Sequence, residues 1–175
     1  NNLIIFGYNG SDQITIERIL SDQNYRIDVF QFADQTISLN ELMKSGLPIY
    51  SREGDAVING WGYANIVTGG SEDQTITTYG YSDVIRTGGG NNTVYAGAGN
   101  DAIYSGSGNN FLQGGTGSDN YVFSKGHGQD IVADNGDGPN GYTRSSSIVD
   151  TIKFTDVNFA DVKFARDGNN LIIFG

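Results

Sequence analysis

Three aspartates, Asp83, Asp101 and Asp119, recur at intervals of 18 residues, each at the end of a loop that contains glycine. Such loops bring carboxylate oxygens together with backbone carbonyls that no side chain shields. Calcium is a hard cation that takes six to eight oxygen ligands of these two kinds. If a coil stacks the aspartates about 5 Å apart, their charges repel each other unless a cation lies between them. The spacing therefore predicts a calcium-binding edge.

The element that positions these aspartates is a repeat of nine residues. Residues 51–122 divide into eight blocks of nine, and the eighth position of every block is apolar or aromatic. These residues are Ile58, Val67, Ile76, Ile85, Val94, Ile103, Leu112 and Tyr121. One inward residue between two outward ones makes a short strand, and the glycine-rich remainder turns the chain by half a coil. The pattern predicts an all-β fold: a parallel β-roll, or right-handed β-solenoid, with two nonapeptides per turn and short flanking strands.

A coil of two blocks sorts the sixth positions of the blocks onto two edges. One edge carries Asn65, Asp83, Asp101 and Asp119, and the other carries Ala56, Gln74, Asn92 and Asn110. The second edge has no carboxylate, so we expect a neutral hydrogen-bonding ladder there between Asn92 and Asn110, because an amide both donates and accepts. The first four blocks lose most of the glycines and acids, and we expect this part of the roll to be largely metal-free.

Beyond the eighth block the pattern slips by two residues and then returns. The return places Asp130 over Asn110 and, after an insertion, Asp150 over Asp119. The best calcium site combines the carboxylates of Asp101 and Asp119 with the carbonyls of Ala96, Ala98, Gly115 and Gly117. The second-rank ligands are Asp83, Asn110, Gly126, Gly128, Asp130 and Asp150, with Asp134 and Asp137 on the insertion.

The block at residues 114–122 has the form G-G-x-G-x-D-x-U-x, and the block at 96–104 departs from it only at the first position. With these motifs, residues 87–132 resemble the repeat region of the RTX exoprotein family. Residues 150–175 followed by 1–43 are similar to the haemolysin-type calcium-binding related segment that follows such repeats. The resemblance implies calcium between stacked turns, export of an unfolded bacterial chain by a type I system, and folding when extracellular calcium is met. It also implies a secreted or cell-surface location.

A second repeat has a much longer period. Residues 169–175 are identical to residues 1–7, at an offset of 169 − 1 = 168 residues. We interpret this as one unit of a tandem array, with an overlap that cuts the array inside a strand. A cloning or design artefact is the alternative interpretation. Exposed strand edges recruit other chains, so we expect neighbouring copies to meet head to tail.

The expected organisation has three parts. Residues 1–50 form a strand-rich segment that ends the preceding unit, residues 51–132 form the roll, and residues 133–175 hold the insertion and the strands that follow it. Within the first part we expect strands at 13–19 and 25–32 and a helical turn at 40–44, capped by Asn40.

Composition excludes several classes of function. The formal net charge of −10 leaves no basic patch for nucleic acid, and the absence of cysteine excludes disulfides and cysteine-bound metals. No run of about 18 apolar residues predicts a membrane span. The only histidine, His127, lies in a turn, where we expect a solvated side chain and no catalytic triad. The sequence therefore favours a non-enzymatic calcium-binding spacer.

Two alternatives remain open. Trp61, Tyr63, Tyr79 and Tyr81 lie on turns that have lost their glycines, and exposed aromatic rings can stack on sugars. They predict a carbohydrate-binding or adhesion module, unless they only cover the metal-free end of the roll. The second alternative is an accessory module of a polysaccharide-modifying enzyme or a toxin.

Overall fold

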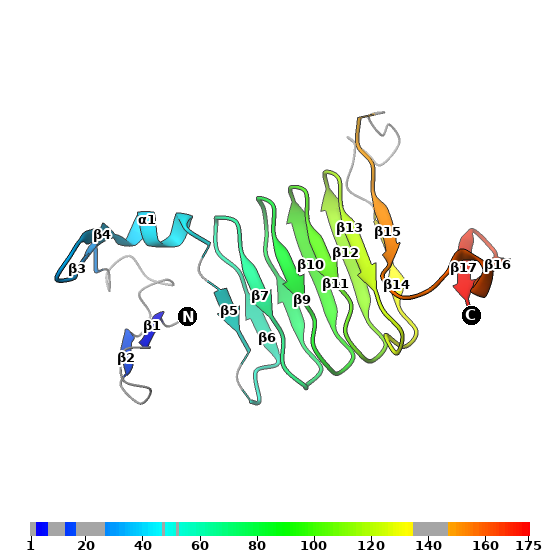
Figure 1. Cartoon of the computed structure of the whole chain (residues 1–175), viewed down its shortest axis with the longest axis horizontal. Helices are drawn as coiled ribbons and strands as arrows, with labels where there is room; N and C mark the ends of the chain where they lie inside the picture. The colour runs from blue at the N-terminus through cyan, green and yellow to red at the C-terminus, as the bar shows by residue number, and fades with distance from the viewer. Residues whose placement is uncertain (1–2, 7–12, 17–26, 47, 52, 135–146) are drawn as a thin grey trace. The chain divides into compact units, whose positions relative to one another are not determined.

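The computed structural model describes residues 3–6, 13–16, 27–46, 48–51, 53–134 and 147–175. The chain divides into two compact units, residues 1–45 and 46–175. The second unit holds the roll, whose strands stack side by side (Figure 1). Asp137 and parts of the two strands expected at 13–19 and 25–32 lie outside the described residues.

The roll consists of two parallel sheets. One has the order β14-β12-β10-β8-β6 and the other β15-β13-β11-β9-β7-β5. The strands are β5 (Pro48–Tyr50), β6 (Val57–Asn59), β7 (Ile66–Thr68), β8 (Thr75–Thr77), β9 (Val84–Arg86), β10 (Thr93–Ala98), β11 (Ala102–Tyr104), β12 (Phe111–Thr116), β13 (Asn120–Phe123), β14 (Ile131–Val132) and β15 (Thr151–Phe154). Successive strands alternate between the sheets, so each coil uses two nonapeptides, and the predicted parallel β-roll is confirmed.

The core is a double column of eighth-position side chains between the two sheets. Val94 lies beside Ile76 on one side and Leu112 on the other, in a register of 18 residues. All eight inward residues are at most 4% exposed, and Ala96 and Phe123 join their cluster. Burying one such side chain contributes about 1.5–3 kcal/mol to stability. Each nonapeptide therefore adds a contribution of this size to the core.

The roll begins earlier and ends later than the nonapeptides alone indicate. β5 pairs with β7, and at the other end β14 pairs with β12 and β15 with β13. Ile131 lies opposite Phe111, and Thr151 lies opposite Asn120. The predicted placements of Asp130 over Asn110 and of Asp150 over Asp119 are therefore confirmed, because each aspartate immediately precedes a paired residue.

Glycine is required where the turns of the roll stack most closely. Gly97, Gly99, Gly115 and Gly117 have φ values between 108° and 136°, and a Cβ on any of them would collide with a carbonyl of the preceding turn. In the preceding turn the equivalent positions hold Tyr79 and Tyr81, which adopt φ of 70° and 72°. These two tyrosines follow the same backbone path as the glycines, although residues with a side chain rarely adopt a positive φ.

Two antiparallel hairpins flank the roll in sequence. β16 (Lys163–Asp167) pairs with β17 (Asn170–Phe174), after the short 3₁₀ helix Phe159–Asp161. In the first unit, β1 (Leu3–Phe6) pairs with β2 (Gln13–Ile16).

The first unit also contains a hairpin of β3 (Val29–Gln31) and β4 (Thr36–Ser38), followed by α1 (Leu39–Lys44). The expected cap at Asn40 is wrong, because Ser38 caps the helix in a reciprocal capping box with Glu41. The hydrogen bonds from Ser38 lower the pKa of Glu41. Within the described residues, no helix is both long and apolar enough to cross a membrane.

Candidate metal centre

The aspartate column comprises the sixth-position residues along one edge of the roll: Asn65, Asp83, Asp101, Asp119 and Asp150. The backbone N–H of each member donates to Oδ1 of the next. The N···O distances along the column are 2.6, 2.7, 2.8 and 2.8 Å. These bonds fix every carboxylate in the stack at one of its oxygens.

The carboxylates of the column lie in a poorly solvated environment. Asp101 and Asp119 are 0% exposed, and Asp83 is 1% exposed. Burial raises the pKa of Asp101 to about 7, and the neighbouring charges of Asp119 and Asp83 add to the increase. Burial likewise raises the pKa of Asp83. Asp101 therefore holds its proton up to near-neutral pH unless a cation replaces it.

The residues around Asp101 fit a calcium ion. Its Oδ2 is buried and has no hydrogen-bond partner among the described residues, although a buried acceptor left unsatisfied costs about 1–3 kcal/mol. In the loop that precedes Asp101, the carbonyl oxygens of Gly97 and Gly99 lie directly against Gly115 and Gly117 of the next turn. Stacked turns thus offer the mixture of carboxylate and carbonyl oxygens that calcium takes.

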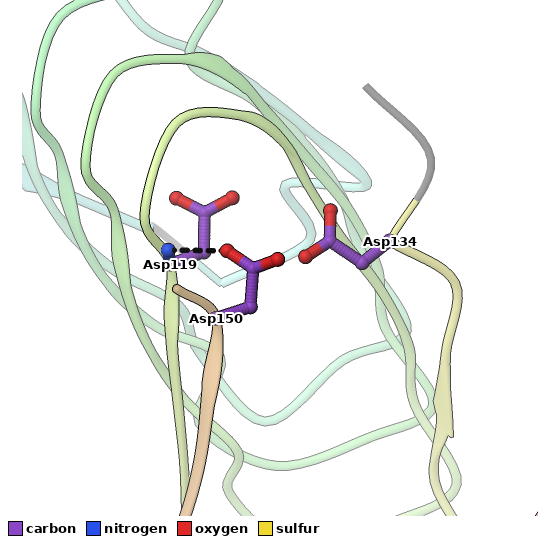
Figure 2. Close-up of side chains that lie close together, drawn as sticks. All are labelled: Asp119, Asp134 and Asp150. Atoms are coloured by element: carbon purple, nitrogen blue, oxygen red, sulfur yellow. Dashed lines mark hydrogen bonds between the residues drawn. The ribbon is translucent and has the colours of Figure 1, made fainter. Parts of the chain in front are cut away.

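A second group of carboxylates converges at the last turn of the roll. One oxygen each from Asp119, Asp134 and Asp150 lies within 4.8 Å of the others, and Figure 2 shows the three side chains directed toward a common point. Burial and the adjoining Asp150 carboxyl raise the pKa of Asp134 to about 7. Three carboxylates held this close can bind a divalent cation.

The position of Asp134 follows from the strand register. Continuing the pairing of Leu112 with Val132 by two residues places Asp134 opposite Gly114, the first residue of a nonapeptide. A side chain at this position points into the loop, since a Cβ on Gly114 would collide with Oδ2 of Asp119. An aspartate here therefore adds a carboxylate to the loop interior, where the nonapeptide pattern has glycine.

Comparison with known sequence families agrees with this geometry. The RTX calcium-binding nonapeptide repeat family matches residues 68–103, 77–112 and 99–129. The haemolysin-type calcium binding protein related domain matches residues 2–37. Residues 68–129 therefore carry RTX calcium-binding nonapeptide repeats. RTX repeats of this type bind calcium, as the sequence predicts. A search of curated proteins found no match.

The RTX match ends before two of the three converging carboxylates. Asp134 and Asp150 both follow residue 129, the last that the repeat family covers. Sequence reasoning placed Asp150 over Asp119 but left Asp134 on the insertion without a partner. The available signal was its distance of two residues from Val132, which fixes it at the first position of the next block.

The carbonyls expected to complete the Asp101–Asp119 site have different surroundings. The Ala96 carbonyl accepts a hydrogen bond of 2.9 Å from the Thr78 hydroxyl. Ala98 and Gly115 lie within the paired parts of β10 and β12. Gly117 lies against the carbonyl of Gly99. Gly97 also lies in the paired part of β10, so it is the carbonyl of Gly99, at the fourth position of the nonapeptide, that joins the candidate ligands the sequence suggested.

The opposite edge of the RTX roll is a ladder of amides. The N–H and Nδ2 of Asn92 both donate to Oδ1 of Asn110 at 3.0 Å, so the predicted ladder is confirmed. The N–H of Gln74 donates to Asn92 Oδ1 in the same way, at 3.0 Å. This edge satisfies its polar groups without a cation.

The ladder ends at Asp130, whose two oxygens are engaged by protein groups. Oδ1 accepts from the backbone and side-chain nitrogens of Asn110 at 2.8 and 2.9 Å. Oδ2 accepts from the Ser105 hydroxyl at 2.9 Å and lies 2.8 Å from Nδ1 of His127. The expectation of a solvated His127 is wrong, because its side chain is 28% exposed and contacts Asp130.

The two glycines expected near Asp130 differ from each other. Gly128 lies against the carbonyl of Gly108 in the preceding turn, whereas Gly126 is exposed and has no atom within 4 Å of its would-be Cβ. Only Gly128 continues the close stacking of the roll.

Proposed function

We propose that calcium ions bind along the aspartate column and hold the turns of the roll together. The candidate ligands between turns are the carboxylates of Asp101 and Asp119 with the nearby glycine carbonyls. Asp83 belongs to a further position of the same kind, and Asp119, Asp134 and Asp150 form the last one. The observation that carries the proposal is the buried Oδ2 of Asp101, which has no hydrogen-bond partner among the described residues.

Calcium in this position acts as a folding switch. Without the ion, folding must bury several carboxylates next to one another, which opposes formation of the column. A cation that binds the folded turns and not the unfolded chain stabilises them by linkage. The fold and the ion then form together, which suits a chain that is exported unfolded and meets calcium outside the cell.

We further propose that the module is a rigid spacer within a secreted or surface protein that carries tandem copies of it. The identity of residues 1–7 and 169–175 supports the tandem arrangement. A roll with a continuous core transmits load along its stack, and calcium stiffens it. This role requires no catalytic residues, and the matched families are calcium-binding repeats.

Calcium titration followed by circular dichroism and calorimetry tests the proposal. We expect strand content and melting temperature to rise with calcium and to fall again with a chelator. The double variant Asp101→Asn, Asp119→Asn should lose most of this response. Asp161→Asn, which changes an exposed acid outside the column, is the matched control and should keep it. Equal calcium responses in the double variant and in the control would overturn the proposal.

A second candidate function is glycan binding by the aromatic turns. Tyr63 and Tyr81 stack with ring centroids 6.1 Å apart, and Tyr79 and Tyr81 are 59% and 60% exposed. Flat exposed rings of this kind bind the apolar faces of sugars. Reproducible binding on a glycan array that Tyr81→Ala abolishes, with the calcium response unchanged, would favour this function.

A further inference from the structure

The same seven-residue sequence forms a strand in two different hairpins. In residues 1–7 its central part is β1, which pairs with β2. In residues 169–175 it is β17, which pairs with β16. One sequence therefore has two established strand partners.

The two pairings use equivalent residues of the repeated sequence. Ile4 lies opposite Thr15, while Ile172, the equivalent residue of the second copy, lies opposite Ala165. A strand has two edges, and in a meander of three antiparallel strands the outer two occupy opposite edges of the central one. A Leu-Ile-Ile-Phe strand that pairs with β16 on one edge therefore has its other edge open to a strand such as β2.

Each hairpin is incomplete as it stands. β16–β17 and β1–β2 are separate two-stranded sheets in the described part of the chain, and an isolated hairpin is marginally stable in water. In antiparallel pairing every second residue of β17 directs its N–H and C=O away from β16. Phe164, Leu171 and Phe174 also remain 51%, 66% and 46% exposed. A third strand would pair these backbone groups and cover apolar surface.

We propose that β17 of one copy of this chain pairs with β2 of a second copy, in the place that β1 occupies in the second copy. The resulting sheet has the order β16, β17, β2, with Ile172 of one copy opposite Thr15 of the other. This contact specifies the proposed head-to-tail arrangement of copies and is independent of the calcium sites. Each copy offers both β17 and β2, so the association is heterologous and can continue from one copy to the next.

Disulfide trapping tests the register directly, because the chain has no cysteine of its own. Chains carrying Thr15→Cys and differently tagged chains carrying Ile172→Cys are unfolded, mixed, refolded with calcium and oxidised. We expect a mixed disulfide at several times the yield found when Ile14→Cys replaces Thr15→Cys, since neighbouring positions of a strand alternate between its two faces. The intramolecular pair Ile4→Cys, Thr15→Cys is the positive reference. Equal yields from the Ile14→Cys and Thr15→Cys chains would overturn the proposal.

Two matched proline variants of the full chain supply a second test. Proline removes a donor from the strand ladder, so Ile4→Pro disables β1 and leaves β2 open to β17 of another copy. We expect the weight-average mass of Ile4→Pro to rise with concentration, and that of Ile4→Pro, Ile172→Pro to stay monomeric. The same mass for both variants would overturn the proposed contact. Calcium titration of each variant reports separately on the metal sites.

Discussion

The backbone N–H of Asp101 donates to the carboxylate of Asp119, one turn further along the roll, over 2.8 Å. The equivalent bond from Asp83 engages Oδ1 of Asp101 and leaves its Oδ2 for a ligand, which predicts how substitutions at Asp101 differ. In Asp101→Asn the acceptor for Asp83 remains and the buried charge disappears. We expect this variant to be more stable than the parent without calcium, by about 1–3 kcal/mol at pH 8, and less responsive to calcium.

Comparing Asp101→Ala with Asp101→Asn separates the effect of the hydrogen bond from that of the charge. Asp101→Asn removes only the charge, and Asp101→Ala differs from it in one respect. It also removes the side-chain oxygen, so the N–H of Asp83 loses its acceptor, and we expect the calcium-free stability to lie about 1–3 kcal/mol below that of Asp101→Asn. Urea unfolding in a chelator measures the difference. Equal stabilities for the two variants would contradict the role of the bond.

Stability without calcium should fall as the pH rises from about 4 to about 7. The pKa of Asp101 is about 7 in the folded chain, whereas an unfolded aspartate titrates near 3.9. The folded state therefore binds more protons than the unfolded state throughout this window, and raising the pH favours unfolding. Asp101→Asn should flatten the trend, and urea midpoints measured in a chelator check it.

Calcium should reverse the direction of that pH dependence. Protons compete with the ion for the carboxylates, so calcium affinity rises as the pH increases through about 7. At a fixed, limiting calcium concentration, the melting temperature should increase between pH 5 and 8. A calcium-induced stabilisation that is equal at both ends of this range would show that the titrating aspartates do not bind the ion.

The carboxylates at the last turn should bind an ion of their own. Asp134→Asn removes a charge from the Asp119–Asp134–Asp150 group without touching Asp101, so calcium stoichiometry should fall by one while the remaining sites persist. Asp156→Asn, at an exposed aspartate that follows β15, serves as the control. Isothermal titration calorimetry measures both, and an unchanged stoichiometry in Asp134→Asn would exclude that site.

Two glycine variants test the close stacking of the loops. Both Gly115 and Gly126 have positive φ, 108° and 85°, but only a Cβ on Gly115 would meet the preceding turn. We expect Gly126→Ala to cost about 1 kcal/mol for the backbone conformation alone, and Gly115→Ala about 3 kcal/mol or more because a collision is added. Similar losses would mean that the turns are not packed as described.

The opposite edge should behave as a calcium-independent structure. Asn92→Ala removes the amide that donates to Asn110 and accepts from the backbone of Gln74, at a cost of about 1–3 kcal/mol. Because this edge satisfies its polar groups without a cation, the loss should be equal in calcium and in chelator. A loss confined to calcium-containing buffer would indicate a metal on this edge.

Much of this architecture follows from local periodicity. The recurrence of Ile76, Val94 and Leu112 at 18 residues fixes the coil length and the core, and the same period stacks the aspartates. Contacts made by residues that do not follow the nine-residue repeat were harder to predict. The pairing of His127 with Asp130 depends on the two-residue slip after the eighth block, and the contribution of Asp134 depends on β14 keeping its register before the insertion.

Helix capping and ligand choice depend on finer geometry. Ser38 and Asn40 are both good capping residues, and only the end of β4 decides that the helix starts after Ser38. Similarly, the nonapeptide identifies which residues are glycines but not which carbonyls face the neighbouring turn. The φ values of Gly97 and Gly99 determine where their carbonyls point, and these φ values depend on how the turns stack.

The stacking also has a kinetic meaning. Each coil touches only the coils before and after it, so the roll behaves as a one-dimensional chain in which order spreads from a nucleus to its neighbours. The converging carboxylates of Asp119, Asp134 and Asp150 join the last two coils at one end. An ion bound there would order the last coils first, and order would then spread from coil to coil toward β6 and β7.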